Sequence, residues 1–427
     1  MQKFIYPDRS EWEAILKRPL FDTTQLHATV SSVLNEIRTG GDIALKELEK
    51  KFDKVELAAL QVSPAEMEEA ASLVSDELKT AIGEAKKNIE IFHSSQRFQS
   101  QKIETTAGVV CWQKAVAIEK VGLYIPGGSA PLFSTVLMLA IPAKIAGCAE
   151  ITLCSPPNSE GKIHPAILFA AQESGVSRIF KLGGIQAIGA MAYGTESVPK
   201  CYKIFGPGNQ YVMAAKQLVS LRDVAIDMPA GPSEVEVLAD ETANAAFVAA
   251  DLLSQAEHGA DSQVVLVTTS EKLIEEVEAE LILQTALLSR SSIAGKALEN
   301  SRMILVKDKQ EMLEITNLYA PEHLIIEMDS YAEFTDKIIN AGSVFLGHYT
   351  PESAGDYASG TNHTLPTNGY ATAYSGVNLD SFIKKITFQE ISKEGIFNLG
   401  KTIEVMAENE QLTAHKNAVT LRLDSLK

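Results

Sequence analysis

Short apolar segments alternate with helical segments from Glu119 onward, and this alternation constrains the fold more than any other feature of the chain. Glycine-rich turns, such as Lys181-Leu-Gly-Gly184, follow several of the apolar segments. A strand, a turn and a helix repeated in this order are typical of βαβ units, which build a parallel sheet. The first run predicts strands at residues 121–125, 150–154, 178–182 and 202–205.

A second run with the same rhythm begins near Val235 and predicts a second sheet. Its strands are expected at residues 235–238, 263–268, 302–306, 323–327 and 343–346. We therefore predict an α/β protein with two Rossmann-like, parallel-sheet domains.

The two ends of the chain lack this rhythm. Residues 30–37 and 66–92 place apolar side chains three and four positions apart among charged ones, which predicts a helical N-terminal region. The tail beyond Asp380 is polar and mostly helical in pattern. Such a tail is typical of an arm that packs on another subunit.

Charge and cysteine content exclude several classes of protein. The formal net charge of -17 argues against binding to nucleic acid or to anionic membranes, since both require a basic surface. The strongest apolar stretch, residues 131–143, is too short to span a bilayer. The 4 cysteines are scattered and form no CxxC pair, which fits reduced thiols and a cytoplasmic protein.

Gln255 and His258 are separated by three positions on a helix predicted over residues 242–258. Residues at this spacing share one helix face and can present two ligands to one metal ion. On the pair alone, a solvated or hydrogen-bonded helix face is favoured over a metal site, which the two residues by themselves only allow.

Glu322 and His323 are adjacent at the start of a predicted strand, directly after Pro321. Successive strand residues point to opposite faces, so two neighbours can share a site only at a strand end. Alcohol oxidation needs a base for the hydroxyl proton, and aldehyde oxidation needs an activated water. On the residues alone, an ordinary solvated pair in a turn is the favoured interpretation of Glu322 and His323.

Several spaced motifs cover nearly the whole chain. The most extensive is Ile226-Asp-Met-Pro-Ala-Gly-Pro-Ser-Glu-Val235, which runs on to Leu253-Ser-Gln-Ala-Glu-His-Gly259. Further motifs are found at residues 121–128, 205–209, 320–324, 354–357, 359–366, 410 and 414–418. In sequence and in order, these motifs resemble those of the histidinol dehydrogenase family.

The resemblance implies a reaction and a domain organisation. The reaction is the oxidation of L-histidinol through L-histidinaldehyde to L-histidine with two NAD+, the final step of histidine biosynthesis. We expect a first α/β domain, with the zinc and substrate site, from residues 25–118 and 235–378. Residues 119–234 form an incomplete Rossmann-like NAD-binding domain, and residues 1–24 and 379–427 are small helical or dimerisation segments.

The resemblance also assigns roles to individual residues. One Zn2+ per subunit is held by Gln255, His258, Asp356 and His415. His323 is the base for the alcohol, and Glu322 activates the water. The substrate contacts are Ser233, Gln255, His258, His323, Asp356, His363, Glu410 and His415.

Glu410 and His415 lie far along the chain from the other site residues. In the family, the C-terminal arm reaches the partner subunit. We therefore expect a homodimer with shared active sites.

The nucleotide site has no GxGxxG fingerprint. The nearest approach, Gly206-Pro-Gly208, lacks the third glycine, although a glycine-rich strand-to-helix turn does expose N–H groups to phosphate. The resemblance assigns NAD+ contacts to Tyr124, Gln186 and Asn209.

Three further questions concern the reaction class. Cys111 and Cys148 could form a thiohemiacetal, but we favour inert thiols and predict that serine replacements retain most activity. A zinc-dependent hydrolase could use the same ligands with Glu322 as its base and would work without NAD+. A non-catalytic relative of the fold is disfavoured because the motif residues are all present, and the N/O ligand set would also accept manganese or cobalt.

Overall fold

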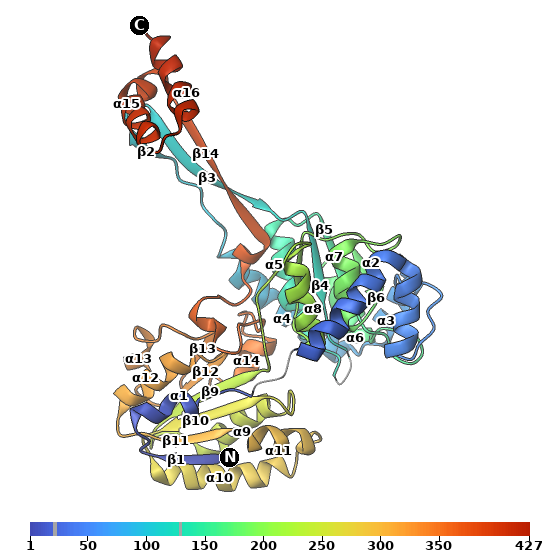
Figure 1. Cartoon of the computed structure of the whole chain (residues 1–427). Coiled ribbons are helices and arrows are strands. Elements are labelled where there is room, and N and C mark those ends of the chain that lie inside the picture. The colour runs from blue at the N-terminus through green and yellow to red at the C-terminus, as the bar shows by residue number, and fades with distance from the viewer. Residues whose placement is uncertain (20–23, 128–129) are drawn as a thin grey trace.

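The computed structural model describes residues 1–19, 24–127 and 130–427. Two parallel sheets lie side by side, and an antiparallel arm extends away from them (Figure 1). The α/β class with two Rossmann-like domains, a helical N-terminal region and a C-terminal arm is confirmed.

The first parallel sheet has the strand order β1-β11-β10-β9-β12-β13. Its strands are β1 (Gln2–Ile5), β9 (Glu234–Ala239), β10 (Gln263–Thr268), β11 (Arg302–Leu305), β12 (His323–Glu327) and β13 (Ser343–Leu346). One face packs on α9 (Ala245–Ala256), α10 (Glu271–Thr285) and α11 (Ser291–Glu299). The other face packs on α1 (Trp12–Ile15), α12 (Lys309–Tyr319) and α13 (Ala332–Thr335). The short helices η1 (Arg9–Glu11) and α14 (Glu352–Tyr357) complete this part.

The second parallel sheet has the strand order β6-β5-β4-β7-β8. Its strands are β4 (Lys120–Tyr124), β5 (Glu150–Ser155), β6 (Arg178–Lys181), β7 (Lys203–Phe205) and β8 (Ala225–Ile226). One face is covered by α3 (Pro64–Leu73), α4 (Asp76–Ser94), α5 (Phe133–Ala146) and α6 (Pro165–Glu173). The other face is covered by α2 (Thr24–Phe52), α7 (Gly184–Tyr193) and α8 (Gln210–Ser220).

The arm is an antiparallel sheet of strand order β14-β3-β2. It contains β2 (Ile103–Thr106), β3 (Val109–Ala117) and β14 (Ile383–Ile391), and its far end carries α15 (Lys393–Asn409) and α16 (Thr413–Asp424) (Figure 1). Two short helices, η2 (Tyr370–Thr372) and η3 (Leu379–Phe382), precede β14.

Every strand predicted from the two runs is confirmed, with ends shifted by one residue at most. The prediction of a mostly helical tail is wrong for β14, which pairs with β3 along its whole length. Its partner lies far away in the sequence, and the side chains of β14 are mostly exposed within one chain, so no local apolar pattern marked the strand.

The predicted helices are confirmed with changed ends. Residues 66–92 form parts of two helices, because the Ser75 side chain accepts a hydrogen bond from the Leu78 N–H and starts α4. The helix expected over 242–258 begins at Ala245, after Asn244, whose side chain accepts the Ala246 N–H at 2.9 Å. Among the described residues, no helix combines the length and the apolar character needed to cross a bilayer.

Glu236 is a buried carboxyl group in the middle of β9, with 0% exposure and no hydrogen-bond partner among the described residues. Burial raises its pKa to about 8, from an ordinary value of 4.5. Since the folded state binds the proton more tightly than the unfolded state, this group lowers stability progressively as pH rises from about 4.5 to about 8. Glu236→Gln is therefore expected to gain melting temperature relative to the parent chain over this range, by several degrees at pH 8.

Melting curves of both proteins between pH 5 and pH 9 check this expectation. If the difference in melting temperature between the two proteins stays constant across the whole pH range, it reflects the new amide alone and contradicts the raised pKa of Glu236.

Candidate active site

Except for His415, the side chains assigned to zinc and to catalysis gather at the amino ends of β9 and β12. Glu322 directly precedes β12, and His323 is its first residue. Helix α9 returns antiparallel to the strands, so its carboxyl end brings Gln255 to the same edge. Helix α14 supplies Glu352 and Asp356. This edge is opposite to the carboxyl edge at which open α/β sheets usually bind ligands.

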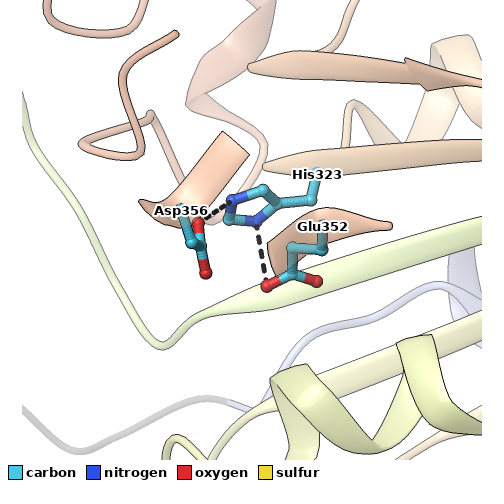
Figure 2. Close-up of side chains that lie close together, drawn as sticks. All are labelled: His323, Glu352 and Asp356. Carbon is cyan, nitrogen blue, oxygen red and sulfur yellow. Dashed lines mark ion pairs between the residues drawn. The ribbon is translucent and has the colours of Figure 1, made fainter. Parts of the chain in front are cut away.

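The imidazole of His323 lies between two carboxylates of α14 (Figure 2). Nε2 lies 3.6 Å from Oδ1 of Asp356, and Nδ1 lies 3.9 Å from Oε1 of Glu352. Glu322 Oε2 is 3.7 Å from Nδ1. Burial alone would lower the pKa of His323, but the charges of Glu352, Glu322 and Asp356 outweigh it and raise the pKa to about 10. The site therefore stabilises a protonated imidazole.

Glu322 is 6% exposed and accepts the backbone N–H of Glu234 at 3.0 Å through Oε2. Burial raises its pKa to about 8, and the nearby His323 only partly opposes this. A carboxyl group with a pKa near neutrality can exchange a proton with water under physiological conditions.

The Gln255 amide is fully buried between Glu352 and the start of β9. Its hydrogen bonds are satisfied when the nitrogen donates to Glu352 Oε1 and the oxygen accepts the Glu234 N–H at 2.9 Å. The amide thus lies directly beside the carboxylates of the site.

Asp356 connects His323 with two further histidines. Its Oδ1 lies 3.9 Å from Nδ1 of His363, and the same nitrogen donates to the Asp356 carbonyl at 3.0 Å. The second nitrogen of His363 is 3.1 Å from the hydroxyl of Thr135. Burial raises the pKa of Asp356, but His323, His363 and His258 outweigh it, so the pKa falls below its ordinary value.

His323, Glu352 and Asp356 bring one ligand atom each to within 4.8 Å of one another. Nε2 of His323 and Oε2 of Glu352 are buried, and neither has a hydrogen-bond partner among the described residues. Buried polar atoms of this kind need a partner, and a set of nitrogen and oxygen donors suits a catalytic zinc ion. The chemistry of this cluster fits a metal ion.

The predicted zinc ligands are only partly together within one chain. Gln255 and Asp356 lie at the cluster, and His258, just beyond the end of α9, interacts electrostatically with Asp356. His415 is exposed on α16, and Glu410 caps the carboxyl end of α15. Both helices lie at the far end of the arm (Figure 1). Within one chain, Glu410 and His415 therefore lie apart from the cluster.

Glu352 was not predicted from the sequence. It stands four residues before Asp356, so both carboxylates share one face of α14. That spacing was the available signal. Ser233 was predicted, and it directly precedes β9, where its carbonyl accepts the Gln263 N–H at 3.2 Å.

The residues assigned to NAD+ lie at the carboxyl edge of the second parallel sheet, the usual place for a nucleotide. Tyr124 ends β4, and its hydroxyl accepts the Gly184 N–H at 3.2 Å. The Gln186 amide donates to Asp53 at 3.0 Å, and the Asn209 side chain caps α8. Gly128, in the predicted motif 121–128, lies outside the described residues.

Gly206 shows why glycine is required in the nucleotide turn. Its φ is 126°, and a Cβ atom there would lie 2.1 Å from the carbonyl oxygen of Tyr124. The backbone of this turn therefore passes directly against the end of β4.

Neither thiol considered for covalent catalysis lies with the histidines. Cys111 is on β3 in the arm, and Cys148 follows α5, where burial raises its pKa to about 12. Cys111→Ser and Cys148→Ser are expected to keep most of the dehydrogenase activity, which steady-state assays of the folded variants would measure. A complete loss in either folded variant would mean that a thiol takes part in the reaction.

Comparisons with known proteins agree with the motifs. The histidinol dehydrogenase family model matches residues 16–423. Histidinol dehydrogenases of Bacteroides fragilis (strain YCH46) and Bacteroides thetaiotaomicron are each 69% identical to the chain, with 100% of both proteins covered in each case. The crystal structure of histidinol dehydrogenase from Elizabethkingia anophelis superposes with a TM-score of 0.98 at 58% identity, covering 100% of this chain and 98% of that one. The chain belongs to the histidinol dehydrogenase family.

Proposed function

We propose that this chain works as a homodimer in which the amino-end cluster of one subunit and the arm of its partner form each active site. The reaction is the NAD-dependent oxidation of L-histidinol to L-histidine, the final step of histidine biosynthesis. One observation supports the location above all others. The buried His323 has a nitrogen, Nε2, with no hydrogen-bond partner in the described part of the chain, and it lies beside Asp356, Glu352 and Glu322.

Zinc belongs to this chemistry, and the residues present suit it. Gln255, His258 and Asp356 would hold the ion together with His415 of the partner subunit. When bound, zinc supplies a Lewis-acidic centre that orients the imidazole and amino nitrogens of the substrate. The remaining chemistry is carried by side chains of the chain itself.

His323 takes the hydroxyl proton of the alcohol while the carbon gives its hydride to NAD+. The products of this first step are the aldehyde, NADH and a protonated imidazole. Glu352 and Asp356, on either side of the ring, stabilise the positive charge that the imidazole gains.

Glu322 then takes a proton from water as the water oxygen bonds to the aldehyde carbon. The resulting hydrate anion gives its hydride to a second NAD+, so the neutral carboxylic acid forms, and Glu322 returns its proton to water. Burial keeps the pKa of Glu322 near neutrality, which suits a group that must both accept and release a proton. His363 and Ser233 of the same subunit, and Glu410 of the partner subunit, would complete the substrate contacts.

We place the nucleotide at the carboxyl edge of the second sheet, against Tyr124, Gln186 and Asn209. Gly206 approaches Tyr124 so closely that only glycine fits at this position. Because glycine has no side chain, a phosphate can approach the backbone N–H groups of the turn. The 4 cysteines are free thiols, which fits a reducing, cytoplasmic setting.

The shared site is tested by following specific activity during dilution, with sedimentation measured at the same concentrations. Activity should fall in parallel with the dimer fraction, because α16, which carries His415, lies far from α14, which carries Asp356 (Figure 1). Full activity at concentrations where only monomer sediments would overturn the shared site. The zinc-hydrolase alternative is not favoured, since the matching relatives are dehydrogenases.

A further inference from the structure

Arg18 lies between the starts of β9 and β12, on the side of the sheet that carries α1 and α12. Its Nη2 donates to Glu234 Oε1 at 3.0 Å, and its Nε donates to the other carboxylate oxygen. The same Nη2 donates to the Tyr319 carbonyl at 2.6 Å. The guanidinium carbon lies 4.0 Å from the centroid of the Tyr319 ring. One side chain therefore binds two chain segments that are more than two hundred positions away in sequence.

Glu234 links this guanidinium to the catalytic pair. Its side chain binds Arg18 and accepts the Tyr319 hydroxyl at 3.2 Å. Its backbone N–H donates to Glu322 at 3.0 Å, and its carbonyl oxygen lies 3.4 Å from Nδ1 of His323. The side chain of this residue is thus fixed by Arg18, while its backbone fixes both catalytic side chains.

The turn before Glu322 also depends on Arg18. Helix α12 ends at Tyr319 and is capped by Ala320, which has a left-handed φ of 51° although it is not glycine. Such a backbone persists only where its surroundings hold it. The Arg18 guanidinium binds the carbonyls of Tyr319 and, at 3.4 Å, Ala320, so it neutralises the carboxyl end of the helix at this turn.

We propose that Arg18 is a positioning residue for the oxidation, which sets Glu322 and His323 by tying the start of β9 to the turn that leads into β12. The inference rests on the roles proposed above for Glu322 and His323. Arg18 itself contacts neither of their side chains, so it acts through Glu234 and the Tyr319–Ala320 turn.

The test compares Arg18→Met and Arg18→Lys with the parent enzyme as zinc-loaded dimers. We expect Arg18→Met to lower kcat roughly 10- to 100-fold, as outer-shell changes around metal sites do, with zinc content and the KM for L-histidinol little changed. Both the alcohol step and the aldehyde step, assayed separately, should slow because both catalytic groups move. Arg18→Lys keeps the positive charge but cannot bind the Glu234 carboxylate and both carbonyl groups at once. Its kcat should therefore lie between those of Arg18→Met and the parent enzyme.

Two further variants separate positioning from folding. Arg18→Met combined with Glu234→Gln removes both buried charges and leaves no unpaired ion, so this double variant should fold if Arg18→Met does not. Its kcat should remain low. Glu236→Gln is the matched control, because Glu236 lies on the same strand and face as Glu234 and is also buried, but has no hydrogen-bond partner within residues 1–19, 24–127 and 130–427. Its kcat should equal that of the parent.

A folded, zinc-loaded Arg18→Met or double variant with the parent kcat would overturn the inference. The inference would also be overturned if Arg18→Met and Arg18→Lys lost kcat to the same extent and this loss matched the loss of folded protein. The activity of Glu322→Gln, measured in parallel, distinguishes the proposed function from the proposed role of Arg18. If Glu322→Gln keeps full activity, the proposed function itself is refuted. If Glu322→Gln loses activity while Arg18→Met keeps the parent kcat, only the role of Arg18 is refuted.

Discussion

Replacing Glu322 with glutamine should turn a four-electron oxidation into a two-electron one. Glutamine can still accept the Glu234 N–H that Glu322 accepts at 3.0 Å, but it cannot take a proton from water. Loss of a general base costs about 10²- to 10⁴-fold in rate, and the loss should fall on the aldehyde step. NADH formed per histidinol should drop from about two to about one, with histidinaldehyde recovered by a carbonyl-trapping reagent.

Glu352→Gln is the matched control for this result. Glu352 lies 3.9 Å from the imidazole of His323, so its replacement should slow the reaction while leaving Glu322 in place. The ratio of NADH to histidinol should then stay at about two. If Glu322→Gln also yields both NADH molecules at the parental rate, another group must activate the water.

Mixing two inactive variants should restore activity. His415→Ala damages only the arm, and Asp356→Asn damages only the cluster at the amino ends of β9 and β12. In a heterodimer, the intact cluster of one subunit meets the intact arm of the other, so one of the two sites is complete. After equal mixing and subunit exchange, activity should reach about one quarter of that of the parent enzyme.

Each variant alone should lose its zinc and nearly all of its activity, because each removes a ligand. The recovery should appear at the rate of subunit exchange, which a label on one variant can follow. Fully exchanged heterodimers that remain inactive would contradict the shared site, as would a His415→Ala protein that is active by itself.

Most strands of both parallel sheets, but not β1 and β8, could be predicted because helices cover both faces of each sheet. In β10, for example, Val264, Val265, Leu266 and Val267 are all buried, so the sequence shows a continuous apolar run. Strands β1, β2, β3, β8 and β14 were not predicted. Strands β1 and β14 each lie at a sheet edge beside a distant segment, β11 or β3, and the local sequence carries little trace of such pairing.

The candidate site was predictable where a motif or a spacing marked it. Glu322 and His323 could be placed at a strand start, and Gln255 on the helix that returns to it. Arg18 could not, because its partners Glu234 and Tyr319 lie 216 and 301 positions away, and nothing near residue 18 indicates them. The N-terminal strand β1 joins the sheet that carries the site, and this pairing brings Arg18 to Glu234 and Tyr319.

The most direct test of the whole account is the stoichiometry of NADH formation with L-histidinol as the sole substrate, repeated after chelation and after zinc is added back. We predict about two NADH per histidinol, lost with the chelator and restored by zinc. A folded, zinc-loaded dimer that forms no NADH from L-histidinol, or forms the full amount with the chelator present, would contradict the account.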